Sequence, residues 1–565
     1  MNLFSIFLNG AILLLCFIFL RHSFTRAIYF LQMLQQHGYK THEYRRWAVS
    51  NFSERIVTSE HILLNFVILC MIYFLSTTVT FATGVIVMFS FTVVWFGDLS
   101  RYKTKQDKKP LVFTSRVNRL VITFILLVIP IYYYLFSFMF SDQLLYITPN
   151  IQEPVGDFLT ADPYFLTFML ILVDIAIPFL LFPAAWLMKP VERSIQNGFK
   201  RQARRKIASM PNLKVVAITG SYGKTSTKFV IDSFLKERMQ VCVTPGSFNT
   251  PMGICKVINN DLKANHQVLI LEMGARYEGN IKELCDLAKP DISVITNVGI
   301  SHLETFGSVE AVAKEKSTLA YELKPGGSLI LNGDDPVVSQ MGSHRNDIKR
   351  VFIGEDGQIT AKNISVDQSG TKFQMEWLSD SGEVDQSEII QTNLLGAHNV
   401  QNLLLGAAVA REFGIRMRTI SIAAVALEPV EHRLELKQRG NLTVIDDAFN
   451  SNPVGAKNAV EILASFEKGR RIIITPGMVE LGELEEQENF KFGEHIGNAN
   501  LELVILVGKE RTKPIYDGIL SVKNGRETDV KVTDSLFEAN ELLKEFARPG
   551  DVVLYENDLP DSYNE

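Results

Sequence analysis

Apolar residues are concentrated in the first third of the chain, where polar segments separate five apolar stretches. These stretches cover residues 4–20, 62–76, 85–96, 120–140 and 165–188. A membrane-spanning helix needs about 20 mostly apolar residues. The second and third stretches are shorter, but the uncharged bridge between them, residues 77–84, would extend both into a hairpin of spans. The pattern predicts an α-helical transmembrane domain with five spans over residues 1–190.

Basic residues in the connecting segments predict how these spans are oriented. Lys and Arg occur between the first and second spans, where they include Arg21 and Arg26, and again between the third and fourth spans. A further basic run, residues 200–206, follows the fifth span within a juxtamembrane linker, residues 191–210. Because cytoplasmic loops are enriched in Lys and Arg, we expect a multi-pass protein of the inner (cytoplasmic) membrane. Its N-terminus would lie outside and its catalytic part in the cytoplasm, with the basic run against membrane lipid.

Asp174 is an acidic residue inside the fifth predicted span. An ionisable group is costly in hydrocarbon, so its presence there suggests a functional site within the membrane. The alternative is a structural role, in which a protonated Asp174 forms a hydrogen bond with a neighbouring helix. The sequence leaves both open.

From residue 213 onward, short β-branched runs alternate with helical stretches, which is typical of parallel sheets built from βαβ units. A strand-rich segment without a helix, residues 351–394, suggests a small antiparallel addition. The alternation resumes at residue 442. We therefore predict two α/β domains: a P-loop-type ATP-binding domain over residues 211–427 and a Rossmann-like domain over residues 428–565. The predicted strands are 215–218, 268–271, 292–296, 329–332, 443–445, 472–474, 504–506 and 552–555.

Composition narrows the range of functions. A length of 565 residues implies several domains. The net charge of −5 argues against a nucleic-acid partner. Five cysteines occur without a CxxC pair or a Cys/His spacing, so neither a disulfide framework nor a zinc site is indicated.

A glycine-bearing turn between a predicted strand and a predicted helix, residues 215–227, is the strongest chemical signal. Backbone N–H groups of such a turn and the positive end of the helix bind phosphates. Lys224 would reach the β- and γ-phosphates, and the hydroxyl of Thr225 would bind Mg²⁺. The turn departs from the strict P-loop pattern, because Ile218 stands where the first glycine is expected.

Glu272 and His302 each follow a predicted strand of the same domain. Polar groups at the carboxyl ends of parallel strands point into the ligand crevice of such a sheet. A hard cation bound by one carboxylate, one imidazole and phosphate oxygens is therefore expected here.

Six motifs that occur in order along the chain resemble those of the Mur ligase family, and most closely those of its members that add D-alanyl-D-alanine. The motifs are Gly220-Ser-Tyr-Gly-Lys-Thr225, Glu272-Met-Gly-Ala275, His302-Leu-Glu-Thr-Phe-Gly-Ser308 with Lys316, Asn332-Gly-Asp-Asp-Pro336, Gly396-Ala-His-Asn-Val-Gln-Asn402 and Asp446-Asp-Ala-Phe-Asn-Ser-Asn-Pro453.

The resemblance implies an ATP- and Mg²⁺-dependent ligase that activates a carboxylate as an acyl phosphate and joins it to an amine. It also implies the catalytic residues Lys224, His302 and Lys316. The implied metal ligands are Thr225 for a first Mg²⁺ and Glu272 and His302 for a second, which Lys316, as a carbamate, helps to place. Asn399 and Asn402 match positions near the adenine, whereas Arg433 and Asp447 match residues that clamp phosphate and ribose. The implied ATP-binding residues are Gly220, Ser221, Gly223, Lys224, Thr225, Ser226, Asn249, Asn399, Asn402, Arg433 and Asp447.

Departures from the family pattern concern the substrates. The membrane domain occupies the place of the family's amino-terminal domain, which grips a UDP-sugar. The signature Pro476-Gly-Met-Val-Glu-Leu-Gly482 lacks the usual Asp, Ala448 and Phe449 replace the usual Ser and Tyr, and the tail after Leu554 lacks a basic Lys-Gly-Ser-Arg-like ending.

Three functions therefore remain open. The preferred one is a membrane-bound ligase that joins an amino acid or dipeptide to a cell-envelope precursor, which could be lipid-linked or UDP-linked. The second is D-alanyl-D-alanine addition to UDP-muramoyl-tripeptide, with the spans serving as an anchor. The third, from another class, is a nucleotide-gated transporter or sensor.

Overall fold

A computed structural model of the chain describes residues 3–57, 95, 102, 111–139, 163–367, 369–379, 381–449, 451–522 and 528–558. The chain divides into two compact units, of which the first comprises residues 1–195 and the second begins at residue 196. Each is described separately below.

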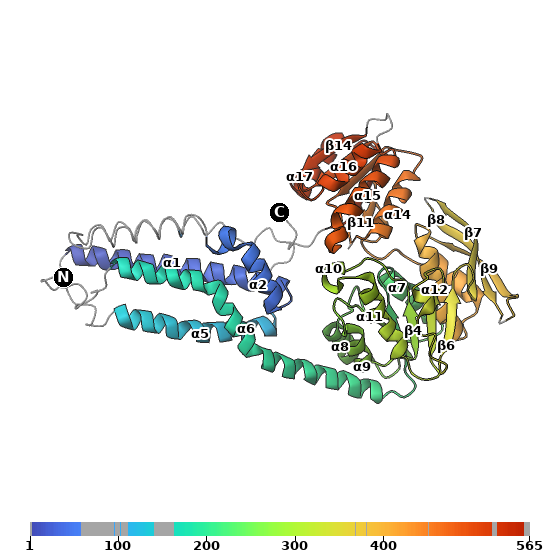
Figure 1. Cartoon of the computed structure of the whole chain (residues 1–565), viewed down its shortest axis with the longest axis horizontal. Coiled ribbons are helices and arrows are strands. Elements are labelled where there is room, and N and C mark those ends of the chain that lie inside the picture. The colour runs from blue at the N-terminus through green and yellow to red at the C-terminus, as the bar shows by residue number, and fades with distance from the viewer. Residues whose placement is uncertain are drawn as a thin grey trace. The chain divides into compact units, whose positions relative to one another are not determined.

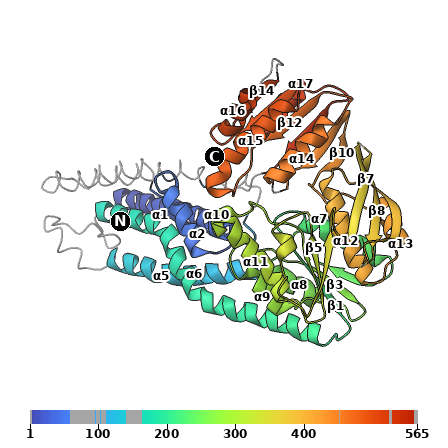
Figure 2. The same ribbon diagram turned by 45° about the vertical axis from the view of Figure 1, so that its right-hand side comes forward.

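The described part of the first unit is helical (Figure 1). Its three long helices run lengthwise beside one another in both ribbon views (Figures 1 and 2). Phe30, Tyr44, Val117 and Leu181 are among the buried residues that pack between the helices. The elements are α1 (Leu3–Gln36), α2 (Thr41–Ser50), the π-helical turn η1 (Phe52–Ile56), α5 (Ser115–Met139) and α6 (Pro163–Ala208), of which α6 continues into the second unit.

Two helical stretches of the described residues are long and apolar enough to cross a membrane, as judged by length and composition. They are Ser115–Tyr134 and Leu172–Ala208, each with a mean hydropathy of 1.7 in its most apolar window. They overlap the fourth and fifth predicted spans. The second and third predicted spans, residues 62–76 and 85–96, fall outside the described residues except for Trp95.

Arg26 and Asp174 form a buried ion pair that links α1 to α6. Arg26 also donates a hydrogen bond to the carbonyl of Ile56, and both charged side chains are fully buried. The prediction that Arg26 lies in a loop is therefore wrong. No glycine or proline stands between Leu20 and Gly38, so α1 continues past the end of the apolar stretch. Asp174 thus bonds to Arg26 of the neighbouring helix α1, and the functional role suggested for it stays a prediction.

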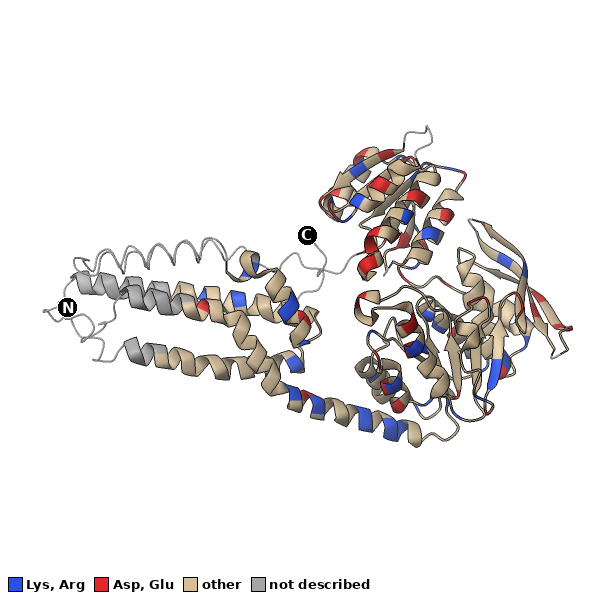
Figure 3. Ribbon diagram, viewed as in Figure 1, with Lys and Arg blue, Asp and Glu red and all other residues tan. Residues whose placement is uncertain are grey.

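The basic run that follows the fifth predicted span is helical and belongs to α6, whose second half contains a series of Lys and Arg residues (Figure 3). Lys200 forms an ion pair with Glu283, and Lys206 Nζ donates a 2.9 Å hydrogen bond to the carbonyl of Asn259. These two cations therefore contact the α/β unit, whereas Arg204 and its neighbours Arg201 and Arg205 are exposed.

A nine-stranded sheet forms the core of the middle domain. Its order is β2-β3-β1-β4-β5-β6-β7-β8-β9, in which the strands up to β7 pair in parallel and β7 to β9 are antiparallel. The predicted parallel sheet with an antiparallel addition is thus confirmed. The strands are β1 (Lys214–Thr219), β2 (Val241–Val243), β3 (Val268–Glu272), β4 (Ile292–Ile295), β5 (Ser328–Asn332), β6 (Lys349–Ile353), β7 (Ile359–Asp367), β8 (Gly370–Leu378) and β9 (Val384–Thr392).

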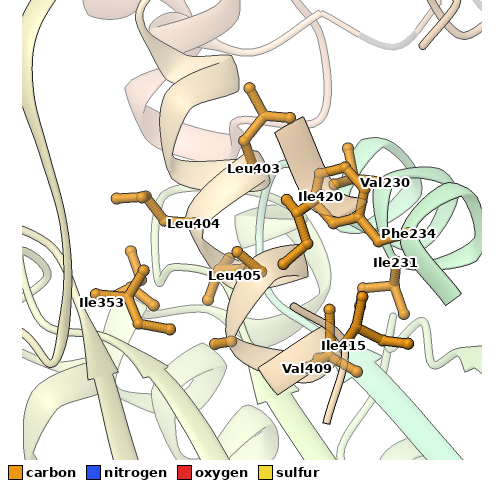
Figure 4. Packing of buried hydrophobic residues seen from close by; sticks show 14 of the residues in the cluster. Val230, Ile231, Phe234, Ile353, Leu403, Leu404, Leu405, Val409, Ile415 and Ile420 are labelled. Carbon is orange, nitrogen blue, oxygen red and sulfur yellow. The ribbon is translucent and has the colours of Figure 1, made fainter. Parts of the chain in front are cut away.

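Helices cover this sheet and bury an apolar core. Figure 4 shows Leu403 and Leu405 of α12 in the same buried cluster as Val230 and Phe234 of α7, all of them almost completely buried, with Leu404 on the side of α12 toward Ile353. This packing fixes α7, the helix that follows the glycine-bearing turn. The helices are α7 (Lys224–Lys236), α8 (Pro251–Asn260), α9 (Asn280–Leu287), α10 (Leu303–Phe306), α11 (Val309–Tyr321), the 3-10 turn η3 (Val338–Gln340), α12 (His398–Glu412) and α13 (Met417–Val425).

The C-terminal domain contains a six-stranded sheet of order β10-β11-β15-β12-β13-β14, which is parallel except for β10. Its apolar strands confirm the second predicted α/β domain. The strands are β10 (Glu435–Arg439), β11 (Leu442–Asp447), β12 (Arg471–Thr475), β13 (Leu503–Val507), β14 (Asp529–Thr533) and β15 (Val552–Glu556). The helices are α14 (Pro453–Ala464), the 3-10 turn η4 (Gly482–Leu484), α15 (Glu485–Asn498), α16 (Lys513–Ser521) and α17 (Leu536–Phe546).

Candidate active site

The glycine-bearing turn lies between β1 and α7, as predicted. A Cβ atom on Gly220 would lie 1.8 Å from Thr296 Oγ1, so only glycine fits this close approach. Gly223 has a φ of +77° and immediately precedes α7. The first backbone N–H groups of a helix lack intrahelical partners, and they make the N-terminus of this 13-residue helix a favourable place for phosphate.

The segment after β4 fixes the shape of the turn. The amide of Tyr222 donates a 2.8 Å hydrogen bond to Asn297 Oδ1, and Thr296 Oγ1 donates to the carbonyl of Tyr222. Gly299 N donates to Ser221 Oγ at 2.8 Å. The turn is therefore pre-shaped by the protein itself. Ser226, which follows on the first turn of α7, is half-buried.

Lys224 folds back over the turn, where its Nζ donates to the carbonyls of Gly220 at 2.7 Å and Ser221 at 3.0 Å. Burial lowers the pKa of Lys224 to about 8, although the Glu272 carboxylate opposes the shift. Lys224 therefore still carries its proton for most of the time at neutral pH, at a position where phosphate oxygens could replace the two carbonyls.

Glu272, at the end of β3, is the centre of a buried polar cluster. Its Oε2 accepts from Thr225 Oγ1 at 3.0 Å and from Lys228 Nζ at 3.2 Å, and its Oε1 accepts from Asn249 Nδ2 at 3.1 Å. Burial raises the pKa of Glu272, but the charges of Lys228 and Lys224 outweigh it and hold the pKa below its ordinary value. An ionised carboxylate beside a threonine hydroxyl is an oxygen-rich donor set that fits Mg²⁺.

Lys316 lies on α11 and is 3% exposed. Burial, together with the nearby charge of Lys224, lowers its pKa well below the ordinary value for lysine. Its Nζ donates no hydrogen bond to any of the described residues. A buried neutral amine is the form that reacts with CO₂, so the residue fits the carbamate that the sequence suggested.

His302 is held by the C-terminal domain. Its Nδ1 lies 2.8 Å from Glu480 Oε2, and Arg276 pairs with the other oxygen of the same carboxylate. The predicted metal ligands are thus arranged in three places: Thr225 and Glu272 are in direct contact, Lys316 lies near Lys224, and His302 is paired with Glu480.

The two asparagines predicted near the adenine, Asn399 and Asn402, lie next to the glycine-bearing turn. Asn402 Oδ1 accepts a 3.0 Å hydrogen bond from Thr227 Oγ1, and its Nδ2 donates to Asn399 Oδ1 at 2.9 Å. A Cβ atom on Gly223 would lie 2.7 Å from Asn402 Oδ1. In this structure the asparagines therefore pack against the glycine-bearing turn and the start of α7.

Arg433 and Asp447 come from the C-terminal domain. Arg433 lies over the ring of Phe449 at 4.9 Å, and one of its guanidinium nitrogens lies 3.4 Å from Thr225 Oγ1. The substitution of Phe for the usual Tyr at residue 449 thus keeps an aromatic face for Arg433. Burial raises the pKa of Asp447 to about 6, and its carboxylate accepts from the amide of Leu434.

Two residues of the site were missed from the sequence. Lys228 stands one helical turn after Lys224, and this i, i+4 spacing places the two lysines on the same face of α7. Glu480 was noted only as part of a motif. Its contact with His302 depends on the packing of two separate sheets, and no sequence spacing encodes that packing.

Comparisons with known proteins match both α/β domains. Residues 218–410 match the Mur ligase middle domain, and residues 432–555 match the Mur ligase, glutamate ligase domain. The UDP-N-acetylmuramoyl-tripeptide–D-alanyl-D-alanine ligase of Mycobacterium tuberculosis is 34% identical over 365 residues, which cover 60% of this chain and 70% of that protein. The ligase of the same name from Bacillus subtilis is 30% identical over 344 residues, which cover 60% and 72%.

Solved structures agree in fold. MurF from Acinetobacter baumannii superposes with a TM-score of 0.58 at 23% identity, covering 65% of this chain and 78% of that one. MurF ligase from Thermotoga maritima, in complex with ADP, superposes with a TM-score of 0.56 at 26% identity, covering 64% and 80%.

Proposed function

The chain belongs to the Mur ligase family and is an ATP- and Mg²⁺-dependent amide-bond ligase, and we propose that it adds D-alanyl-D-alanine to the carboxylate of a UDP-linked muramoyl tripeptide. One observation carries the proposal: relatives named for this reaction match 60% of this chain at 30–34% identity over 70–72% of their own length. This function has more support than a membrane-bound ligase that acts on a lipid-linked precursor. Family membership also favours a ligase over a transporter or sensor.

The residues of the site suit this chemistry. The N-terminus of α7 and Lys224 would hold the phosphates of ATP, and Arg433 would add positive charge beside Thr225. Glu272 and Thr225 would hold Mg²⁺, with Lys316 and His302 completing the site. When bound, Mg²⁺ supplies positive charge that neutralises the phosphate oxygens. Phosphoryl transfer requires little of the protein beyond such positioning and electrostatic stabilisation.

The reaction has two steps. A carboxylate oxygen of the acceptor takes the γ-phosphoryl group, and ADP leaves. The nitrogen of the incoming amine then attacks the acyl carbon and loses a proton, and the carbon–oxygen bond to phosphate breaks. Amide, ADP and inorganic phosphate are the products.

The test uses the full chain purified in detergent, with ATP, Mg²⁺, UDP-muramoyl-tripeptide and D-alanyl-D-alanine. We expect phosphate release that requires both substrates, together with a product whose mass equals their sum less one water. Lys224→Ala should abolish both signals. Phosphate release supported by other amines but not by D-alanyl-D-alanine would refute the proposed amine.

A lipid-linked acceptor is the second candidate, and the first unit is the reason to test it. Residues 1–217 lie outside both matched domains, and they include the two described helical stretches that could cross a membrane. In membranes supplied with ATP and labelled D-alanyl-D-alanine, the label would then enter the organic-extractable fraction. Label found only on soluble UDP-sugars would rule this acceptor out.

We also propose that the chain resides in the inner membrane with its α/β domains in the cytoplasm. The proposal is supported by the distribution of Lys and Arg between the apolar stretches.

A further inference from the structure

Glu480 is the residue through which the C-terminal domain contacts a metal ligand expected in the middle domain. It lies on the loop of residues 476–484, between β12 and α15. Its carboxylate is shared between two residues of the middle domain, with Arg276 on Oε1 and His302 Nδ1 on Oε2 at 2.8 Å. One side chain therefore connects both domains at the active site.

The 476–484 loop is held firmly in the conformation that presents Glu480. Asn489 brackets Met478, accepting from its amide and donating to its carbonyl, both at 2.9 Å. Glu480 itself has a φ of +66°, an unfavourable backbone conformation for a residue with a side chain. Such conformations are costly and persist where the surroundings impose them.

The middle domain meets this loop with α10 and the residues before it. A Cβ atom on Gly482 would lie 3.4 Å from the amide nitrogen of Glu304, and Ile300 packs against the apolar core of the C-terminal domain. His302 also has a positive φ, +57°. The contact between Glu480 and His302 thus belongs to a packed interface and is more than an isolated surface ion pair.

The contact fixes which nitrogen of His302 is available. A carboxylate accepts hydrogen bonds, so Nδ1 carries the proton that points to Glu480. In the neutral imidazole Nε2 then carries the lone pair, and among the described residues it has no hydrogen-bond partner. Histidine ligands of metals commonly use one nitrogen for the ion while a carboxylate orients the ring through the other.

We propose that Glu480 is a positioning residue for the metal site, which reaches across from the C-terminal domain, holds His302 through Nδ1 and leaves Nε2 to coordinate Mg²⁺. Arg276 occupies the second carboxylate oxygen and so orients Glu480 toward the imidazole. The metal site is therefore complete only when the 476–484 loop lies against His302 of the middle domain. This inference rests on the metal-dependent ligase chemistry proposed above, but it does not depend on the identity of the amine or the acceptor.

The test measures Mn²⁺ affinity by electron paramagnetic resonance, with the full chain in detergent and a non-hydrolysable ATP analogue. Glu480→Ala should weaken Mn²⁺ binding by about 10- to 100-fold, the usual effect of removing such a supporting carboxylate. Glu480→Gln should lose less Mn²⁺ affinity, because its amide oxygen still accepts a hydrogen bond from His302 Nδ1. Glu483→Ala is the matched control, since Glu483 is an exposed carboxylate on the same loop, and it should bind Mn²⁺ like the unmodified chain.

A second comparison separates positioning from a general loss of structure. His302→Ala should weaken Mn²⁺ binding, and adding Glu480→Ala to it should cause little further loss, because both changes remove the same coordination. Metal-free binding of the ATP analogue should stay unchanged in every variant. Normal Mn²⁺ affinity in Glu480→Ala, or losses that add in full, would overturn the proposal. A chain that passes this test yet forms no amide would refute the ligase function alone.

Discussion

At the residue scale, two lysines of the active site have lowered pKa values in different surroundings. Lys224 keeps two carbonyl partners and the Glu272 charge nearby, and its pKa stays near 8. Burial and the charge of Lys224 lower the pKa of Lys316 well below its ordinary value, although the Glu315 carboxylate opposes the shift. The first is suited to bind phosphate as a cation, and the second to react as an amine.

Lys316 should therefore form a carbamate, in which its nitrogen bonds to CO₂ and releases one proton. Removing CO₂ and bicarbonate should lower ligase activity, and adding bicarbonate should restore it. A carbamate signal from ¹³C-bicarbonate should be visible by NMR and vanish in Lys316→Ala. Lys314→Ala, which changes an exposed lysine on the same helix, should keep both the signal and the activity. Activity insensitive to CO₂ would contradict the expectation.

Glu556 should make stability depend on pH. Burial raises its pKa from 4.5 to about 7, against the hydrogen bonds from Ser451 and Thr475. The folded state therefore holds this proton more tightly than the unfolded state does. Its contribution is largest below about pH 4.5 and is lost as the pH rises to about 7.

Glu556→Gln should remove this dependence. Its advantage in unfolding free energy over the unmodified chain should grow from near zero at about pH 4 to about 3 kcal/mol at pH 8. Urea unfolding at several pH values measures this difference. Glu545→Gln, at an exposed position, should show a constant difference across the same range. A constant difference for Glu556→Gln as well would refute the prediction.

At the element scale, the turn before α7 depends on glycine for two reasons. Gly223 has a φ of +77°, and a Cβ atom there would meet Asn402 Oδ1. Gly326 has a φ of +75°, but a Cβ atom on it would have no heavy atom within 4 Å among the described residues. A comparison of Gly223 with Gly326 therefore separates the effect of the left-handed backbone from that of the contact with Asn402.

Gly223→Ala should weaken nucleotide binding more than tenfold, because Asn402 must move and the turn that it supports must shift. Gly326→Ala should cost about 1 kcal/mol of stability from the left-handed backbone alone and leave binding intact. A fluorescent ATP analogue and thermal unfolding measure the two effects. Equal binding losses in both variants would show that strain, and not the contact with Asn402, is decisive.

The pair of helices α1 and α6 depends on the buried charges of Arg26 and Asp174. Asp174→Ala should destabilise the first unit by about 3–5 kcal/mol, because it leaves the Arg26 charge buried without its carboxylate. Replacing both, as Arg26→Met with Asp174→Ala, should recover part of that loss. Thermal unfolding of the full chain in detergent provides the measurement. A double variant less stable than Asp174→Ala would contradict a mainly electrostatic origin.

At the scale of the whole molecule, the topology proposed from the basic residues can be tested with terminal epitope tags. In intact spheroplasts, external protease should remove an N-terminal tag and spare a C-terminal one. Permeabilised cells should lose both tags. Protection of the N-terminal tag in intact spheroplasts would contradict the proposed orientation.

The sequence predicted the central strands of both sheets because their β-branched runs are apolar on both faces. It did not predict β10 and β14. These strands lie at the edges of the C-terminal sheet, where exposed residues such as Arg439 and Lys531 interrupt the apolar pattern. In the first unit, the apolar pattern marked the interior of α1 but not its end, since the helix continues through polar residues to Gln36.

The sequence by itself determined the two α/β domains, the glycine-bearing turn and the ligase chemistry, because these depend on local periodicity and on motifs of fixed spacing. Only the tertiary structure decided which side chains meet across long separations. Arg26 finds Asp174 148 residues away, and Glu480 lies 178 residues from His302. Such contacts depend on how helices and sheets pack, and that packing follows from the burial of whole surfaces, which no short stretch of sequence specifies.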